Sequence, residues 1–272
     1  MGSFRHAGDI LEAIVGAKRD DVERLKRGTP RRALIARAAA REPRDFHAAL
    51  AGEGIAIIAE LKKASPSAGI LRRVYHPVDI ARGYETAGAA ALSVLTEEHY
   101  FQGNLDHLTA ARDAVSIPVL RKDFIIDEYQ VYESAAAGAD AVLLIARLLG
   151  REELARLVEL CYTLRVSPLV EIYSEDDIGK ANASGARILG INNRDLRSAQ
   201  VNIERTIALK KSLPEDCLVV SESGIRNADD LSTLVRAGVR AALIGESLLR
   251  HEDPGRALAN LRRELIQAHG QS

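Results

Sequence analysis

The stretch IAIIAELKKASPSAG, at residues 55–69, changes within a few positions from an apolar strand to a polar loop. Alternate residues of a strand share a face, so Glu60 and Lys62 are expected to point to the same side. Two hydroxyl side chains, Ser65 and Ser67, follow in the loop. An acid, a base and two hydroxyls at the end of an apolar strand indicate a reaction site at the carboxyl end of that strand.

Apolar runs of the same kind recur along the chain, and amphipathic segments separate them. The eight predicted strands are Ile55–Leu61, Ala90–Thr96, Pro118–Lys122, Ala141–Ala146, Pro168–Ile172, Ile188–Asn192, Cys217–Ser221 and Ala241–Gly245. The predicted helices between them include Val78–Ala87, Glu128–Ala137, Glu152–Leu164 and Ala228–Ala237. Glycines suited to a left-handed helix cap follow such helices, at Gly88, Gly138, Gly185 and Gly238. The chain therefore reads as a repeat of βα units.

Eight βα units predict a (β/α)8 TIM barrel at residues 55–272. A doubly wound open sheet is the alternative, since periodicity alone does not exclude it. Two observations favour closure. The strand count matches a barrel, and polar residues follow nearly every strand, whereas an open sheet gathers its ligand groups at one switch point.

Residues 1–54 predict an N-terminal helical extension packed on the barrel. Apolar residues stand at helical spacing within Asp9–Arg27, and Thr29 is predicted to cap a second helix that begins at Pro30. No low-complexity linker follows, so residues 1–272 are expected to form a single TIM-barrel domain.

The composition restricts the class of protein. The chain has 272 residues and a formal net charge of −1, which gives no electrostatic footprint for nucleic acid or an anionic membrane. Cys161 and Cys217 fit neither a disulfide framework nor zinc spacing, and both are expected to pack in the core. No stretch approaches the roughly 18 apolar residues of a membrane helix. We expect a cytoplasmic protein that is a monomer or weak homo-oligomer.

Charged, amide and hydroxyl side chains stand at the predicted strand ends, which face one mouth in a barrel. They are Glu60, Lys62, Glu97, Lys122, Asp123, Glu171, Asn192, Arg194, Asp195, Glu222 and Ser223. A single such charge is more often solvated or paired structurally. However, Lys122 lies within PVLRKDFII and Glu171 within SPLVEIY, where an unpaired charge is costly unless it lines a polar cavity. Asp123 and Asp195 fit equally well as groups that orient neighbouring cations.

The same strand ends offer no support for a metal or nucleotide cofactor, because the sequence lacks a Cys/His cluster, a P-loop and a GxGxxG after a strand. A phosphate site is indicated instead by SESGIRNADD at residues 221–230 and LIGES at residues 243–247. In barrels the loops after strands seven and eight often hold phosphate through glycine N–H groups. Each motif alone also fits an ordinary turn. Phe101 and Phe124 follow strand ends, where they either wall an aromatic substrate or pack under their own loops.

Several of these segments, in order, resemble the indole-3-glycerol phosphate synthase family, the barrel enzymes that close the indole ring in tryptophan biosynthesis. The matching segments are IAELKKASPSAG, LSVLTEEHYFQGN, PVLRKDFIIDEYQVYES, AVLLIARLL, PLVEIYSEDD, ILGINNRDL, VSESGIRNADDL and ALIGESLLR. The resemblance covers nearly the whole chain. It implies ring closure, decarboxylation and dehydration of 1-(2-carboxyphenylamino)-1-deoxy-D-ribulose 5-phosphate to indole-3-glycerol phosphate, carbon dioxide and water, with no cofactor.

By resemblance, Lys122 is the general acid that protonates the ketone oxygen and Glu171 is the base that assists dehydration. Glu60 and Lys62 orient and polarise the reacting part of the substrate. Substrate contacts are expected from Asn192, Arg194, Leu196, Phe101, Phe124 and Glu222. Phosphate contacts are expected from Ser65, Ser67, Ser223, Gly224 and Gly245.

Two further expectations concern charge. Crowding of Lys62, Lys122 and Arg194 is expected to lower the pKa of the acid below the ordinary lysine value. Glu246 stands where some family members have a small hydroxyl residue, so the phosphate contact after the last strand is expected to be mainly through the backbone.

Two other functions remain open from the residues alone. One is another phosphosugar-converting barrel, either an isomerase or an aldolase that forms a Schiff base on Lys62 or Lys122. The other is a barrel that binds a phosphorylated ligand without turnover.

Overall fold

The computed structural model describes residues 7–194 and 200–269, and within them eight parallel strands close into a barrel in the order β1-β10-β9-β8-β7-β6-β5-β4. The strands are β1 (Ala56–Leu61), β4 (Ala91–Leu95), β5 (Val119–Lys122), β6 (Ala141–Ile145), β7 (Ser167–Ile172), β8 (Ile188–Asn192), β9 (Leu218–Glu222) and β10 (Ala241–Ile244). A short antiparallel pair, β2 (Ala64–Ser65) and β3 (Gly69–Ile70), follows β1. The predicted TIM barrel is confirmed, and the open sheet is wrong because β1 pairs with both β4 and β10.

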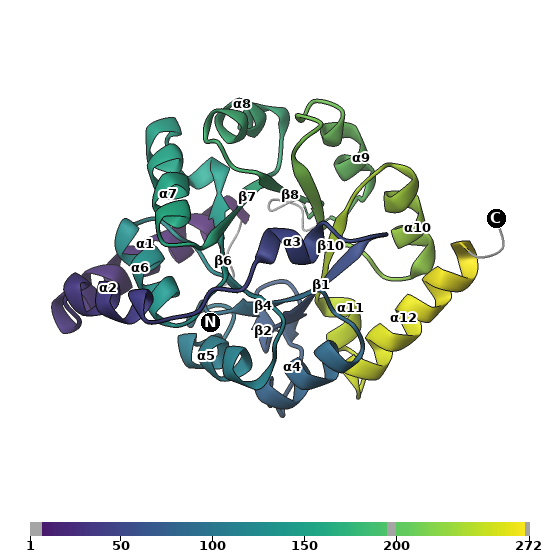
Figure 1. The fold of residues 1–272 in the computed structure, drawn as a ribbon, viewed down its shortest axis with the longest axis horizontal. Coiled ribbons are helices and arrows are strands. Elements are labelled where there is room, and N and C mark those ends of the chain that lie inside the picture. Colours follow the sequence, from purple (N-terminus) through teal and green to yellow (C-terminus); the bar gives the residue numbers. More distant parts are fainter. Residues whose placement is uncertain (1–6, 195–199, 270–272) are drawn as a thin grey trace.

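A ring of helices surrounds the barrel (Figure 1). They are α4 (Pro77–Thr86), α5 (Leu105–Ala114), α6 (Glu128–Ala136), η1 (Ala146–Leu148), α7 (Arg151–Thr163), α8 (Glu175–Ala183), α9 (Glu204–Lys210), α10 (Ala228–Arg236), α11 (Glu246–Leu249) and α12 (Pro254–His269). The four predicted cap glycines all have positive φ, between 72° and 94°. Each therefore ends its helix in the left-handed conformation and turns the chain toward the next strand.

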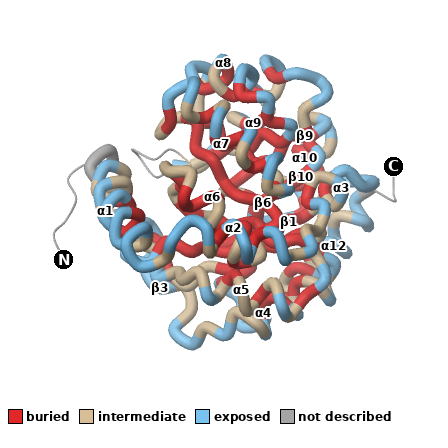
Figure 2. The backbone as a smooth tube through the Cα atoms, turned by 60° about the vertical axis from the view of Figure 1, so that its left-hand side comes forward, coloured by how far each residue is buried: buried red, intermediate tan, exposed pale blue. Residues whose placement is uncertain are grey.

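The N-terminal extension consists of α1 (Ala7–Gly28), α2 (Arg31–Ala39) and α3 (Phe46–Leu50). Figure 1 shows α3 crossing one end of the barrel, where Phe46 and Leu50 are fully buried against the barrel interior. In Figures 1 and 2, α1 and α2 lie on one side of the barrel, next to α6. These helices thus extend the barrel at its end and its flank.

The predicted start of the second helix is wrong by one residue. The helix begins at Arg31, and Pro30 is its N-cap with φ −61° and ψ 137°. The Pro30 carbonyl accepts the first helical hydrogen bond, from the Ala33 N–H at 2.9 Å. The fixed φ of proline suits an extended residue as well as a helical one, so its ψ, which the sequence does not restrict, decided the boundary.

The barrel interior is apolar along most of its length and becomes polar at the carboxyl ends of the strands. Inward-facing residues such as Ile58, Leu120, Leu169, Val220 and Leu243 form one buried cluster, and buried residues colour the barrel red in Figure 2. Two residues further along the same strands, and hence on the same face, come Glu60, Lys122, Glu171, Glu222 and Gly245. The alternation of the strands therefore carries these groups into one opening.

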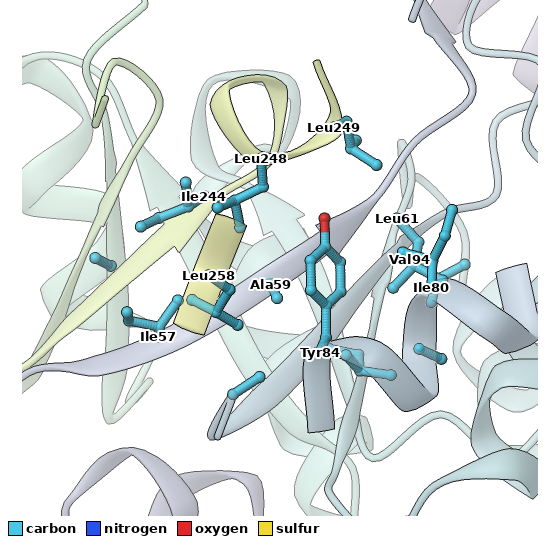
Figure 3. Packing of buried hydrophobic residues seen from close by; sticks show 14 of the residues in the cluster. Ile57, Ala59, Leu61, Ile80, Tyr84, Val94, Ile244, Leu248, Leu249 and Leu258 are labelled. Carbon is cyan, nitrogen blue, oxygen red and sulfur yellow. The ribbon is translucent and has the colours of Figure 1, made fainter. Parts of the chain in front are cut away.

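A second apolar cluster packs the helices onto the outside of the barrel. Figure 3 shows Tyr84 of α4 standing among Ala59, Leu248 and Leu249. Tyr84 is fully buried, and its hydroxyl donates a hydrogen bond to the Glu60 carbonyl at 3.4 Å. This packing fixes the end of β1 from outside the barrel at Glu60, whose side chain lines the cavity.

Cys161 is buried as expected, whereas Cys217 is only partly buried because it lies just before β9 begins. Both cysteines are free thiols. Among the described residues, no helix combines the length and the hydropathy that a membrane span requires.

Candidate active site

A cavity of about 880 Å³ opens at the carboxyl ends of the barrel strands. It is lined by all the residues predicted to act in catalysis or to bind substrate or phosphate within the described part of the chain: Glu60, Lys62, Ser65, Ser67, Phe101, Lys122, Phe124, Glu171, Asn192, Arg194, Glu222, Ser223, Gly224 and Gly245. Of the other strand-end candidates, Asp123 lines the cavity and Glu97 does not. The predicted residues Asp195 and Leu196 lie outside the described residues. Residues from seven different βα units thus meet at one place, as the barrel topology requires.

An ammonium group lies between two carboxylates at the floor of the cavity. Lys122 Nζ is 3.3 Å from Glu171 Oε2 and 3.3 Å from Glu222 Oε2. A second ion pair joins Lys62 to Glu60 on the neighbouring strand β1. The three carboxylate side chains are at most 6% exposed. The site therefore holds two proton donors and three proton acceptors in a region that water barely reaches.

The expected low pKa of Lys122 is wrong. Burial alone would lower the pKa of this ammonium, but the negative charges of Glu222, Glu171 and Glu60 outweigh burial and raise its pKa above the ordinary lysine value. The sequence suggested that other cations crowd Lys122. In the structure, Lys62 is paired with Glu60 and Arg194 with Glu246. Lys122 thus stays protonated throughout the neutral range.

The pKa of Glu222 is raised as well, but here burial is the cause and the neighbouring ammonium opposes it. Burial, and to a smaller extent the charges of Glu171 and Glu60, raise its pKa to about 7, although Lys122 lowers it. A Cβ atom on Gly190 of β8 would lie 2.1 Å from Glu222 Oε1, so only glycine at this position leaves room for the carboxylate. The absent side chain on β8 therefore creates the space in which Glu222 is buried beside Lys122.

Asn192 connects the ends of three strands. Its Nδ2 donates to Glu171 Oε2 at 3.3 Å, and its Oδ1 accepts from the Arg194 N–H and from Ser223 Oγ, both at 3.0 Å. These three partners lie on β7, after β8 and after β9. Asn192 orients Glu171 and holds the first residue of the predicted phosphate loop.

The loops predicted to hold phosphate bring strained or close-packed backbone to the cavity. Ser223 has φ 68°, an uncommon value for a residue with a side chain, and Gly224 follows with φ 84°. After β10, a Cβ on Gly245 would lie 2.3 Å from Glu60 Oε1, so the backbone there passes directly over the carboxylate of β1. Strain of this kind clusters at ligand-binding sites, which agrees with the predicted role of these loops.

One wall of the cavity comes from a part of the chain that sequence reasoning did not assign to the site. Ile10, Leu11 and Ile14 of α1 line the cavity, together with Phe101 and Phe124, whose ring centroids are 6.2 Å apart. The apolar spacing within α1 indicated a helix that covers the barrel, but it did not indicate which surface the helix covers. The result is an apolar wall opposite the charged floor.

Asp123 connects α1 to the barrel, and its contacts are those of a group that orients neighbouring cations. Its carboxylate accepts from Lys18 Nζ of α1 at 2.9 Å, from Arg121 Nη2 at 3.0 Å and from Thr96 Oγ1 at 2.6 Å. Burial would raise the pKa of Asp123, but Arg121 and Lys18 lower it to about 2. Asp123 lies in the sequence between Lys122 of the charged floor and Phe124 of the apolar wall. Its ion pair with Lys18 therefore connects α1 to the barrel directly beside both.

Asp123→Asn should lower the free energy of unfolding by about 2 kcal/mol at neutral pH, because this is the free energy that corresponds to lowering the pKa of the carboxyl from 3.8 to about 2. Since the folded-state pKa is depressed, this stabilisation is present above the unfolded value of 3.8 and is lost as pH falls toward about 2. Urea denaturation at a series of pH values checks this. A difference from the wild type that stays constant down to the lowest pH would contradict it.

Glu97, also at a strand end, has a structural role. Its carboxylate accepts the backbone N–H groups of His99, Tyr100 and Phe101, at 2.7 to 3.0 Å. It therefore shapes the loop that presents Phe101 to the cavity and does not line the cavity itself.

Glu246, which follows Gly245, forms ion pairs at the edge of the cavity. Its Oε2 lies 3.2 Å from Arg194 Nη2, and its Oε1 lies 2.6 Å from Arg250 Nη2. The side chain thus remains at the cavity edge, held by two arginines from different loops. Arg226, Ser247 and Arg250 also line the cavity. Arg226 and Ser247 belong to the two motifs predicted to hold phosphate but were not named individually, and Arg250, an exposed arginine after α11, carries no distinctive sequence signal.

Comparison with known proteins identifies close relatives over nearly the whole chain. A family model described as "Indole-3-glycerol phosphate synthase" matches residues 11–261. A protein of Burkholderia vietnamiensis with the same description is 45% identical over 257 residues, which cover 93% of this chain and 98% of that protein. A protein of Burkholderia cenocepacia, also so described, is 44% identical over the same lengths.

Solved structures share the fold at low sequence identity. A thiamine phosphate pyrophosphorylase from Pyrococcus furiosus superposes with a TM-score of 0.60 at 18% identity, and covers 78% of this chain and 96% of its own. An orotidine 5'-phosphate decarboxylase from Pyrococcus horikoshii superposes with a TM-score of 0.58 at 15% identity, and covers 77% and 98%. At these identities the likeness concerns the barrel alone.

Proposed function

The chain belongs to the indole-3-glycerol phosphate synthase family, and from this premise we propose how its own residues carry out the reaction. It is a decarboxylating lyase of tryptophan biosynthesis that acts on a phosphorylated small molecule. This membership replaces the isomerase, the aldolase and the non-catalytic barrel that the residues alone left open. The observation that carries the proposed roles is the contact of Lys122 with Glu171 and Glu222 on the cavity floor.

The substrate, the carboxyphenylamino deoxyribulose phosphate, lies across the cavity. Its phosphate binds the loops after β9 and β10, through Ser223, Gly224 and Gly245, with Ser65 and Ser67 on the opposite side. Its aromatic ring packs on the apolar wall formed by α1, Phe101 and Phe124. The ring carboxylate faces the cations Lys62 and Arg194, with Asn192 and Glu222 nearby. This placement brings the ketone of the sugar chain above Lys122.

Ring closure requires a proton donor at the ketone oxygen. The ring carbon that carries the carboxylate attacks the ketone carbon, and Lys122 transfers a proton to the oxygen as negative charge develops there. Its raised pKa does not prevent this step, since an alkoxide is far more basic than an amine. Loss of carbon dioxide from the same ring carbon then restores the aromatic sextet.

Dehydration requires one acid and one base. Lys62 protonates the new hydroxyl, which leaves as water, while Glu171 removes a proton from the neighbouring chain carbon to complete the indole ring. Glu171 then returns its proton to Lys122 across their 3.3 Å contact, and solvent reprotonates Lys62. Glu60 orients Lys62 through their ion pair.

The proposed activity is tested by adding the carboxyphenylamino sugar phosphate and recording indole fluorescence. Formation of indole-3-glycerol phosphate together with one carbon dioxide per turnover supports it. No fluorescence from folded protein would exclude it. Borohydride in the same reaction should trap no adduct on Lys62 or Lys122, since no Schiff base is formed.

Glu171→Gln should slow dehydration about a hundredfold while ring closure changes severalfold at most, because only dehydration uses this residue as a base. The variant should therefore accumulate a decarboxylated, hydroxylated intermediate, which rapid-quench analysis and mass spectrometry detect. Asp176→Asn, an exposed neutral substitution on α8, is the control. Equal slowing of both steps would assign the base role to Glu60 instead.

We further propose that the chain acts in the cytoplasm as a single domain, monomeric or weakly self-associating. Sedimentation equilibrium over a range of concentrations tests the association. A dimer that persists at nanomolar concentration would contradict it.

A further inference from the structure

Among the described residues that line the cavity, basic and acidic side chains are equal in number. The basic ones are Lys62, Lys122, Arg194, Arg226 and Arg250, and the acidic ones are Glu60, Asp123, Glu171, Glu222 and Glu246. The substrate of the proposed function carries a phosphate and a carboxylate, whereas Lys62, Lys122, Arg194 and Arg250 already form ion pairs with carboxylates of the chain. An anion that binds one of these four cations therefore exchanges an ion pair within the cavity for an ion pair with the substrate.

The pair of Arg194 with Glu246 exchanges more readily than the pairs on the cavity floor. The carboxylates of Glu171 and Glu222 are 6% and 1% exposed, and removing the partner of a buried charge is strongly unfavourable. The side chains of Arg194 and Glu246 are 28% and 31% exposed, so water can solvate either of them when they separate. Separating the ion pair at the edge of the cavity therefore costs less free energy than separating an ion pair on its floor.

Glu246 also keeps a partner when Arg194 leaves. Its Oε1 accepts from Arg250 Nη2 at 2.6 Å and from Arg250 Nε at 3.1 Å, whereas its bond to Arg194 is a single contact through Oε2. Two bonds from one guanidinium are a stronger attachment than one. An anion that enters the cavity can therefore take Arg194 while Glu246 remains bound to Arg250.

We propose that Glu246 sets the affinity of the cavity for anions, because it holds Arg194 until a substrate anion takes this arginine and then stays on Arg250 alone. This inference rests on the proposed function for the identity of the anion. Although burial raises the pKa of Glu246, the hydrogen bond and charge of Arg250 and the charges of Arg194 and Lys62 lower it below its usual range. At neutral pH the residue is thus a full negative charge beside the phosphate loops.

Glu246→Gln tests the proposal, since it removes the charge and keeps the shape. The dissociation constant of inorganic phosphate or of 2-aminobenzoate should fall roughly three- to tenfold by titration calorimetry at low salt, and the gain should shrink at high salt. Tighter phosphate alone assigns Arg194 to the phosphate, and tighter 2-aminobenzoate alone assigns it to the carboxylate. Unchanged or weaker binding of both probes would mean that Glu246 merely orients Arg194, and would overturn the proposal.

Two comparisons complete the test. Glu252→Gln makes the same change of charge at an exposed position outside the cavity lining and should leave both dissociation constants unchanged. Arg250→Gln should weaken anion binding in the wild type, because Glu246 then holds Arg194 more strongly, and should have little effect in the Glu246→Gln background. Equal weakening in both backgrounds would show that Arg250 binds the anion itself, and would overturn the exchange.

These measurements need no turnover, so they are independent of the proposed reaction. If the wild type binds phosphate but forms no indole, the proposed function fails and the phosphate result still decides the role of Glu246. If indole forms normally and Glu246→Gln leaves both probes unchanged, only the ion-pair exchange fails.

Discussion

Lys122→Met should slow indole formation at least about a thousandfold, the upper part of the range for loss of a general acid that also stabilises developing charge. Methionine has nearly the length of lysine but carries neither the proton nor the charge that the ketone oxygen requires. Single-turnover fluorescence with saturating substrate measures the effect. Binding of inorganic phosphate should change little, because the phosphate loops lie after β9 and β10.

The variant also leaves Glu171 and Glu222 without their shared cation. Two buried carboxylates close together do not both stay ionised, so at least one of them should take up a proton, and the protein should be less stable at alkaline pH. Phosphate binding confirms that the assayed protein is folded. Lys211→Met, at an exposed position at the end of α9, is the matched control and should keep full activity. Turnover of Lys122→Met near the wild-type rate would exclude the acid role.

Asp140→Ala should lower the free energy of unfolding by about 3–5 kcal/mol, which is typical when one partner of a buried ion pair is removed. The side chain is fully buried just before β6, at the end of the barrel opposite the cavity. It accepts the N–H groups of Arg44 and Val119 at 2.8 and 3.0 Å, and it lies 3.1 Å from Arg112 Nε and 3.5 Å from Arg41 Nη1. Without it, buried guanidinium groups lose their counter-charge.

Urea denaturation followed by circular dichroism measures this loss. Asp45→Ala is the matched control, since Asp45 caps α3 by accepting the Ala48 N–H at 2.8 Å and its removal should cost about 1 kcal/mol. Folded Asp140→Ala should keep its turnover number because the substitution is far from the cavity. Equal destabilisation by the two substitutions would show that Asp140 contributes only its backbone hydrogen bonds.

Much of the fold and of the cavity lining was predictable because both depend on local patterns. Strand alternation and the position of each strand end predict Lys122 and Glu171 at the same mouth from the sequence alone. The pKa of Lys122 was not predictable, because it depends on which charges lie within a few ångströms. The sequence suggested that cations crowd it, but the barrel places Glu222 and Glu171 beside it instead.

Residues whose roles depend on distant segments were the hardest to interpret. Asp123 follows the predicted acid and resembles a second catalytic group, but its partner Lys18 lies in a helix more than a hundred positions earlier in the chain. The same helix supplies Ile10, Leu11 and Ile14 to the cavity wall. The two arginine partners of Glu246, Arg194 and Arg250, come from segments more than fifty positions apart in the sequence, so the sequence did not indicate its ion pairs.

The amino-acid sequence alone determined the number of βα units, the parity of each strand and hence the set of side chains at the mouth of the barrel, since these properties follow from spacing along the chain. Tertiary structure alone decided which charges are paired, where α1 covers the barrel and how strongly each acid or base holds its proton. Those properties depend on distances between segments and on burial, and neither is encoded in any single stretch of sequence.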